Sequence, residues 1–293
     1  MRFGLSMPVI QQIPGRVQPW ETAAGAGALV AVAQAADRLG FSHVSVCDHV
    51  AIPQSYAASA GTVWYDAAVT LGFLAAVTTR VRLLSHVMVV PYRHPLVVAK
   101  AFATLDHLSG GRVILGAGCG HLKPEFRSLG AHYEERGAIT DEYLQAIGVA
   151  WENPCATFEG RFVQFREVTV APRASQQPRP PIWIGGNSRA AVRRAVRHGD
   201  GWIPWMVLPG GFAELVAYAH ELQEQEGRGT PMEFVAPLSV SADADTAAIT
   251  AQIEAWRTAG ATSFHVGFVH HSLEHLLERM QFFATGAGLT TSL

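Results

Sequence analysis

The chain has 293 residues and a formal net charge of −2, with 49% hydrophobic and 16% charged residues. This balance argues against a nucleic-acid-binding surface, and no apolar run reaches the roughly 20 residues that a membrane-spanning helix needs. The opening residues, MRFGLSMPV, are interrupted too soon for a signal peptide. Cys47, Cys119 and Cys155 have no metal-ligand spacing and cannot all pair within one chain. We therefore expect a reduced, cytoplasmic protein with no nucleic-acid or membrane partner.

The N-terminal part of the chain alternates apolar runs with a helical pattern. The Ala-rich run GALVAVAQAADRL ends at Gly40, and glycine is typical of helix C-termini. The first connecting segment is polar and Pro-rich, which indicates a loop. In chain order, we predict a strand over residues 2–7, a loop over 11–20, a helix over 27–39, a strand over 42–47, a loop over 50–63 and a helix over 65–78.

The stretch from Val81 to Pro124 has the pattern of a strand–helix–strand unit. An apolar, β-branched run over residues 81–90 is followed by a helix that opens at His94–Pro95, with proline at the first helical position. A short apolar strand over 112–115 then breaks into a glycine-rich turn over 116–121. Such a unit places two strands in parallel, and continuous apolar runs predict strands buried on both faces.

The rest of the chain continues this alternation after one interruption. Residues 155–181 contain two short alternating runs around a turn signal at Glu159–Gly160 and end in the Pro-rich QQPRPP, so we interpret them as a surface insertion. Ser188 suits the N-cap of a helix. In chain order, we predict a helix over 134–151, a strand over 182–184, a helix over 189–198, a strand over 201–204, a helix over 211–225, a strand over 233–240, a helix over 246–259, a strand over 263–267 and a helix over 272–284.

Eight strands with helices between them predict a (β/α)8 TIM barrel. We expect one domain over residues 1–293, with the surface insertion (about 155–181) between strands 4 and 5. A doubly wound open sheet is the alternative fold. That fold normally carries a GxGxxG fingerprint after its first strand, and none is present here.

Three groups of candidate functional residues lie where predicted strands end, which is where α/β barrels hold their active sites, and a fourth lies within the predicted strand over 81–90. They are Asp48–His49, Ser85–His86, Gly118–His121 and Gly185–Ser188. The position of Asp48–His49 favours a functional role over a loop or cap role, whereas His86 taken alone fits a core histidine better. The glycine-rich segments could bring backbone close to a ligand, or could be plain turns. Gly185–Ser188 also precedes a helix, whose N–H groups and dipole suit a phosphate.

These residues resemble the bacterial-luciferase-like superfamily, and within it the coenzyme F420-dependent oxidoreductases. The matching stretches are FGLSMP, SVCDHV, RVRLLSHVMVVPYRHPLVVAKAFATLDHLSGGRVILGAGCGHLKPEF and PPIWIGGNSRAAVRRAVRHGDGW. These stretches follow one another in the order that the family has, and their motifs are specific for it. The match fades after Trp205. The resemblance implies a TIM barrel with a flavin or 5-deazaflavin at its mouth, and it suggests a homodimer.

The resemblance also implies roles for individual residues. It implies a non-prolyl cis peptide bond at His86–Val87, whose bulge would back the cofactor ring. Members that oxidise sugar phosphates carry a glutamate where this chain has His121, which argues against sugar-phosphate chemistry here. The implied cofactor-binding residues are Asp48, His86, Val87, Cys119, Gly120, Gly185, Gly186 and Asn187.

We therefore predict a deazaflavin-dependent oxidoreductase that moves a hydride between coenzyme F420 and a small organic substrate. Histidine exchanges protons near neutral pH, so we assign the acid/base role to His49 and a positioning role at the catalytic centre to His121. We expect no metal. Trp64, Trp202 and Trp205 could form apolar walls of the site or belong to the core.

Three alternatives stay open. An FMN-dependent luciferase-like monooxygenase differs in its cofactor, and a non-catalytic flavin- or deazaflavin-binding protein would bind without turnover. The 13 histidines also allow a metal-dependent barrel hydrolase. Such hydrolases typically end strand 1 in a His-x-His pair, and here that strand ends in Ser6–Met7–Pro8.

Overall fold

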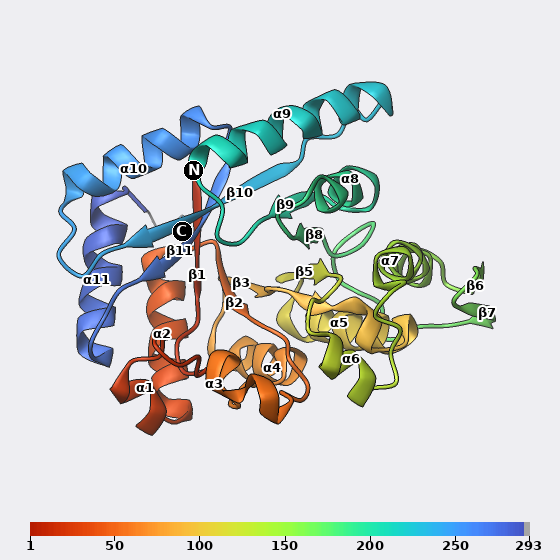
Figure 1. Cartoon of the computed structure of the whole chain (residues 1–293), viewed down its shortest axis with the longest axis horizontal. Coiled ribbons are helices and arrows are strands. Elements are labelled where there is room, and N and C mark those ends of the chain that lie inside the picture. The colour runs from red at the N-terminus through yellow and green to blue at the C-terminus, as the bar shows by residue number, and fades with distance from the viewer. Residues whose placement is uncertain (290–293) are drawn as a thin grey trace.

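The computed structural model, which describes residues 1–289, is a closed barrel of eight parallel strands surrounded by helices (Figure 1). β1 pairs with β11 and β3 pairs with β5, so hydrogen bonds run around the whole ring. The predicted (β/α)8 fold is confirmed. The barrel strands are β1 (Arg2–Ser6), β2 (His43–Val46), β3 (Arg82–Ser85), β5 (Val113–Gly118), β8 (Ile182–Gly185), β9 (Gly201–Ile203), β10 (Glu233–Val240) and β11 (Ser263–Phe268).

One long helix follows each barrel strand, and several begin or end as the sequence predicts. Gly40 ends the first in the left-handed conformation (φ 83°), and Pro95 is the first residue of the third. The Ser188 side chain caps α8 by accepting from the N–H of Ala191. The eight helices are α2 (Ala26–Leu39), α4 (Ala67–Val77), α5 (Pro95–Ser109), α7 (Arg136–Glu152), α8 (Arg189–His198), α9 (Pro209–Gln225), α10 (Thr246–Thr258) and α11 (Leu273–Gly286).

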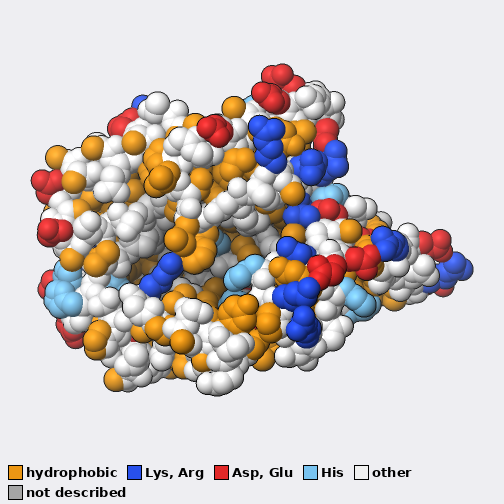
Figure 2. Space-filling model, in the orientation of Figure 1, with side chains coloured by type: hydrophobic (Ala, Val, Ile, Leu, Met, Phe, Trp, Pro, Cys, Tyr) orange, Lys and Arg blue, Asp and Glu red, His pale blue; other side chains and the backbone are white. Residues whose placement is uncertain are grey.

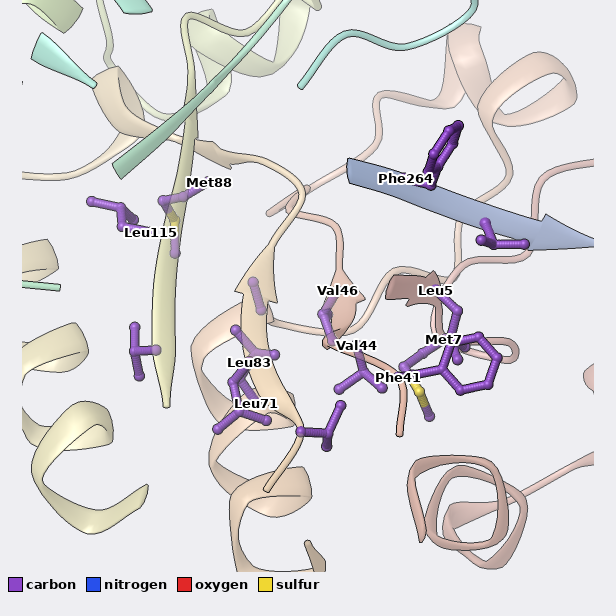
Figure 3. Packing of buried hydrophobic residues seen from close by; sticks show 14 of the residues in the cluster. Leu5, Met7, Phe41, Val44, Val46, Leu71, Leu83, Met88, Leu115 and Phe264 are labelled. Carbon is purple, nitrogen blue, oxygen red and sulfur yellow. The ribbon is translucent and has the colours of Figure 1, made fainter. Parts of the chain in front are cut away.

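Buried apolar side chains form two layers, one outside the barrel wall and one inside it. β2 and β5 are buried along their whole length, as continuous apolar runs predict. Between the wall and the helices, Leu71 of α4 lies near Val44 and Leu83 (Figure 3). The inner layer consists of Leu84, Ile114, Trp183, Ile203 and Val235.

The run predicted as one strand over residues 81–90 is two strands, β3 and the short β4 (Met88–Val89). The chain leaves the sheet between them, at His86–Val87. The peptide bond joining these residues is cis, which confirms the bond expected from the resemblance. β4 then pairs with the end of β5, so strand 3 reaches the barrel mouth in a bent form.

Short helices occupy segments in which no helix was predicted. They are α1 (Pro19–Ala23), α3 (Ala57–Ala60), which follows a 3-10 turn at Gln54–Tyr56, and α6 (Lys123–Ser128). Tertiary contacts decide such short elements, because isolated helices of this length are unstable. In α1, for example, the Glu21 carboxylate accepts from the backbone N–H groups of Gln18 and Val9.

The predicted insertion carries a hairpin that projects from the barrel beside α7 (Figure 1). Its antiparallel strands are β6 (Ala156–Glu159) and β7 (Gln164–Val168), and they meet at the predicted turn. The hairpin therefore packs on the outside of the barrel, against α7. In residues 1–289, no helix combines the length and apolar character needed to cross a membrane.

Candidate active site

His49 follows β2 at the carboxyl end of the barrel and is held by Glu125 of α6. Nδ1 of His49 lies 2.7 Å from Oε2 of Glu125. An ionised carboxylate can only accept hydrogen bonds, so Nδ1 of His49 is the donor. In neutral His49 this tautomer leaves Nε2 unprotonated, ready to take up a proton.

Glu125 is completely buried and receives hydrogen bonds from four groups. Besides His49, the donors are the backbone N–H groups of Val50 (2.7 Å) and Ala51 (3.1 Å) and the hydroxyl of Tyr92 (2.8 Å). Burial alone would raise the pKa of Glu125, but the bonds from His49, Ala51 and Val50 outweigh it and lower the pKa to about 2. The carboxylate is therefore charged at neutral pH and orients His49.

Asp48, next to His49, is bound entirely within the protein. Its two oxygens accept from the Arg93 guanidinium at 2.8 Å each, and one also accepts from the Val89 N–H at 2.9 Å. Because both oxygens are engaged, Asp48 fixes β4 beneath the mouth. Its predicted role in cofactor binding stays a prediction.

Two further rings lie beside His49. The Trp64 ring centroid is 4.4 Å from that of His49, and the His121 centroid is 6.0 Å away, both close to edge-on. Partial burial and the proximity of His49 lower the pKa of His121 below its usual value, so this ring is mostly neutral at pH 7. The two histidines predicted as catalytic are thus brought together, and their roles stay predictions.

The glycines at the end of β5 and just after it make room for protein groups. A Cβ added at Gly116 would lie 1.8 Å from the backbone oxygen of Ser85, and one at Gly118 would lie 2.6 Å from Val87. Gly120 has φ +74°, a conformation that glycine adopts readily. The sequence suggested backbone approach to a ligand, but two of these glycines instead accommodate the chain around His86–Val87.

The turn after β8 joins the predicted phosphate site to the next strand. Gly186 has φ +117°, and its carbonyl accepts from Nε1 of Trp202 at 2.8 Å. The Asn187 side chain donates to the carbonyl of Trp205 and accepts from its N–H. The side chain of Asn187 therefore holds the backbone of Trp205, and its predicted role in cofactor binding stays a prediction. The backbone N–H groups at the start of α8 are available to an anion.

The three tryptophans considered from the sequence have different environments. Trp64 lies beside His49, while Trp202 is fully buried and stacks on Phe212 at 5.0 Å, which makes it a core residue. Trp205 is 53% exposed, in the loop after β9.

A column of histidines runs through the barrel beneath this site. Nε2 of His43 lies 3.2 Å from Nδ1 of His265, whose Nε2 is within 2.8 Å of the Ser6 hydroxyl and 3.2 Å of the Ser45 hydroxyl. The His86 ring meets His265 edge-on at 4.5 Å. Burial lowers the pKa of His43 to about 3 and that of His86 to about 4, so the column is neutral. His86 thus points into the barrel.

Gly4 of β1 and His43 of β2 share one space inside the barrel. A Cβ added at Gly4 would lie 2.1–2.2 Å from the ring of His43. On its other side, the ring is 3.0 Å from the hydroxyl of Ser42. Among residues 1–289, no set of three His, Cys, Asp or Glu side chains has the arrangement of a metal site.

Sequence reasoning missed Glu125, Tyr92 and Arg93 as parts of the site. Glu125 depends on α6, which was not predicted, although the sequence Lys-Pro-Glu carries a signal: proline near a helix start places the glutamate in the first turn. Tyr92 and Arg93 lie in the turn between β4 and α5, and no local pattern shows which carboxylates they reach. Cys119 and Gly120 do lie at the mouth, at the end of β5.

Comparison with known protein families identifies the family of this chain. Residues 1–288 match the family described as luciferase-like monooxygenase. The chain belongs to this family. Luciferase-like relatives include an uncharacterized protein of Mycobacterium tuberculosis, 30% identical over 217 residues, which cover 70% of this chain and 74% of the relative. The FMNH2-dependent dimethylsulfone monooxygenase of Pseudomonas putida is 32% identical over 188 residues, which cover 62% of this chain and 48% of the relative.

Solved structures share the luciferase-like fold over almost the whole chain. The monooxygenase RslO1 of Streptomyces bottropensis superposes with a TM-score of 0.80 and 22% identity, covering 98% of both chains. The coenzyme F420-dependent tetrahydromethanopterin reductase of Methanopyrus kandleri has a TM-score of 0.77 and 16% identity, covering 97% of both chains. At these identities the likeness establishes the fold and leaves the cofactor open.

Proposed function

We propose that this luciferase-like protein is a coenzyme F420-dependent oxidoreductase that transfers a hydride between the deazaflavin and a small organic substrate. The observation that carries the proposal is the His49–Glu125 pair at the barrel mouth. Hydride transfer to a carbonyl or an imine, or from the corresponding alcohol or amine, requires a matching proton transfer, and an oriented histidine supplies it. A 5-deazaflavin, when bound, supplies the hydride donor or acceptor.

The residues at the mouth fit a ring with a phosphate-bearing tail. The start of α8 offers backbone N–H groups and a positive dipole end to a phosphate. Val87 fills the space between Gly118 and Gly185, so the ends of β3, β5 and β8 form one continuous floor for a ring. Arg136 adds positive charge at this edge, since its Nε donates to the carbonyl of Gly120 at 3.2 Å.

His49 performs the proton transfer in this scheme. Glu125 holds its Nδ1–H, so Nε2 accepts a proton from a substrate hydroxyl during oxidation or returns it during reduction. The buried carboxylate stabilises the imidazolium that forms. Burial and the neighbouring carboxylate raise the pKa of Tyr92, which keeps its hydroxyl protonated as a donor to Glu125. His121 and Trp64 border His49 and restrict how a substrate approaches it.

FMN-dependent monooxygenation is the second candidate. The name of the Pseudomonas putida relative supports it, since that enzyme uses FMNH2 and matches this chain more closely in sequence than the F420-dependent structure does. The resemblance in SHVMVV and WIGGNS favours the deazaflavin, and we keep that assignment as our proposal.

A titration of the purified protein separates the two cofactors. Coenzyme F420 and FMN are added in turn, and binding is followed by the absorbance and fluorescence of each cofactor. We expect F420 to bind more tightly than FMN. Tight FMN binding with no F420 binding would refute the F420 proposal and establish the flavin alternative.

We also propose that the protein acts as a homodimer. The adjacent helices α4 and α5 expose Val69 (73%), Phe73 and Val97 to solvent. Contiguous apolar side chains on a surface commonly mark an interface.

A further inference from the structure

Two loops meet across the barrel mouth. The Arg16 guanidinium lies 5.0 Å from the centre of the Trp205 ring, and its Nη2 is 3.5 Å from the sulfur of Met206. Arg16 follows β1 and Trp205 follows β9, and these strands are separated by β11 and β10 in the ring. Because loops that follow parallel barrel strands lie at the carboxyl end, this contact forms a bridge over the opening.

Both ends of the Arg16–Trp205 bridge are fixed by the protein. In the first loop, the buried Glu21 carboxylate accepts from the N–H groups of Val9 (2.8 Å) and Gln18 (3.0 Å). In the second loop, Asn187 holds the backbone of Trp205 through both its amide groups. The bridge is thus anchored to the turn that precedes α8.

Each loop also holds a residue in an unfavourable backbone conformation. Val9 has φ +71° and Met206 has φ +53°, in the left-handed region that non-glycine residues rarely adopt. Such strain persists only where the surroundings impose it, and it collects at ligand sites.

Among residues 1–289, no carboxylate forms an ion pair with Arg16. The guanidinium instead contacts the Trp205 ring and the Met206 sulfur. Arg93 at the same end of the barrel differs, because Asp48 binds it through two hydrogen bonds. Arg16 is therefore an exposed guanidinium at the mouth that can accept an anion.

We propose that Arg16 binds the anionic group, carboxylate or phosphate, of a ligand whose apolar part lies against the bridge. Trp205, Met206 and Leu208 are 53%, 67% and 78% exposed, so the second loop presents apolar surface to such a ligand. Figure 2 shows hydrophobic side chains around a hollow in the middle of the face that it presents. A guanidinium matches the geometry of both anions.

The anion has two possible sources, the cofactor tail or the substrate, because this inference rests on the proposed function. For the cofactor, F420, FMN and riboflavin are titrated into the wild type and into Arg16→Gln; riboflavin has the ring of FMN but no phosphate. For the substrate, benzoate and the neutral benzamide are titrated into the cofactor-free protein and followed by tryptophan fluorescence. Arg257→Gln is the control, because it removes the same charge from the exposed surface of α10.

If the anion is the cofactor phosphate, Arg16→Gln lowers the affinity of the protein for F420 and for FMN about tenfold and leaves its affinity for riboflavin unchanged. If the anion belongs to the substrate, the variant lowers the affinity for benzoate about tenfold. The affinities for benzamide and for the cofactors then stay unchanged. Arg16→Lys should retain part of either affinity. The proposal is overturned if Arg16→Gln and the control Arg257→Gln bind every one of these ligands with the same affinity.

The test also separates this inference from the proposed function. If the wild type binds neither F420 nor FMN, the proposed function fails, and titrations of inorganic phosphate and benzoate into cofactor-free protein still decide the role of Arg16. The proposal is supported if Arg16→Gln, and not Arg257→Gln, lowers the affinity for phosphate or for benzoate. It is refuted if the wild-type protein binds neither anion.

Discussion

Replacing Glu125 by Gln tests the buried carboxylate on which the candidate site depends. The pKa of Glu125 is about 2 in the folded protein, against 4.5 for a free side chain. That difference corresponds to about 3 kcal/mol of folding stability. Because the folded-state pKa is lowered, this stability is present above the unfolded pKa and is lost as pH falls toward 2. We expect Glu125→Gln to lower the free energy of unfolding by about 3 kcal/mol at neutral pH.

Urea denaturation across a pH series measures this loss. From about pH 6 to about pH 3, the gap between wild type and Glu125→Gln should narrow by about 2 kcal/mol. Glu134→Gln is the matched control, since Glu134 is largely exposed and pairs with Lys123 at the surface. That change should lower the free energy of unfolding far less than Glu125→Gln does, because exposed ion pairs contribute little to stability. A gap that is independent of pH, or equal losses in both variants, would refute the reasoning.

The same variant should alter the proton position on His49. A glutamine can place its NH2 group where Oε2 of Glu125 lies, and Nδ1 of His49 must then accept instead of donating. Nitrogen NMR of the imidazole distinguishes the two tautomers. Wild-type protein should show the proton on Nδ1 and the variant should show it on Nε2. The same tautomer in both proteins would contradict the orienting role of Glu125.

The remaining predictions concern the acid/base, the turn after β8 and the outer helices. His49→Gln should lower turnover about 100-fold or more while cofactor affinity is unchanged, as kinetics and titration can show; equal loss of both would contradict an acid/base role. Gly186→Ala should weaken cofactor binding more than Gly210→Ala, because Gly186 has φ +117° and an added Cβ would lie 3.0 Å from Ala191; equal affinities would exclude the turn from the site. Phe73→Asp should convert a dimer into a monomer by light scattering, and an unchanged mass would count against the α4 interface.

Much of the barrel could be predicted because its strands and helices have regular patterns. The helix that starts at Pro95 and the cap at Ser188 depend on local chemistry, which the sequence displays directly. The division of strand 3 at Val87 does not follow from local chemistry, since residues 81–90 are mostly apolar and include no glycine or proline at the break. Only the resemblance to a family indicated the break.

The site was predictable in its positions and less so in its contacts. His49 and His121 could be placed together because both follow barrel strands, which end at one face. Glu125 could not be paired with His49, because the contact depends on α6 and spans 76 residues. The role of Gly118 was also hidden, since a missing side chain does not show whether a ligand or Val87 occupies the space.

The shared space of Gly4 and His43 makes the two positions interdependent in evolution. The imidazole stands where any side chain at position 4 would begin, so a larger residue there is tolerated only after His43 becomes smaller. Shortening His43, in turn, removes a hydrogen-bonding partner of His265 inside the barrel. A larger residue at position 4 therefore depends on a change at position 43. Among relatives of this protein, alanine at position 4 should occur with a small residue at position 43, and the two changes should be inherited as a pair.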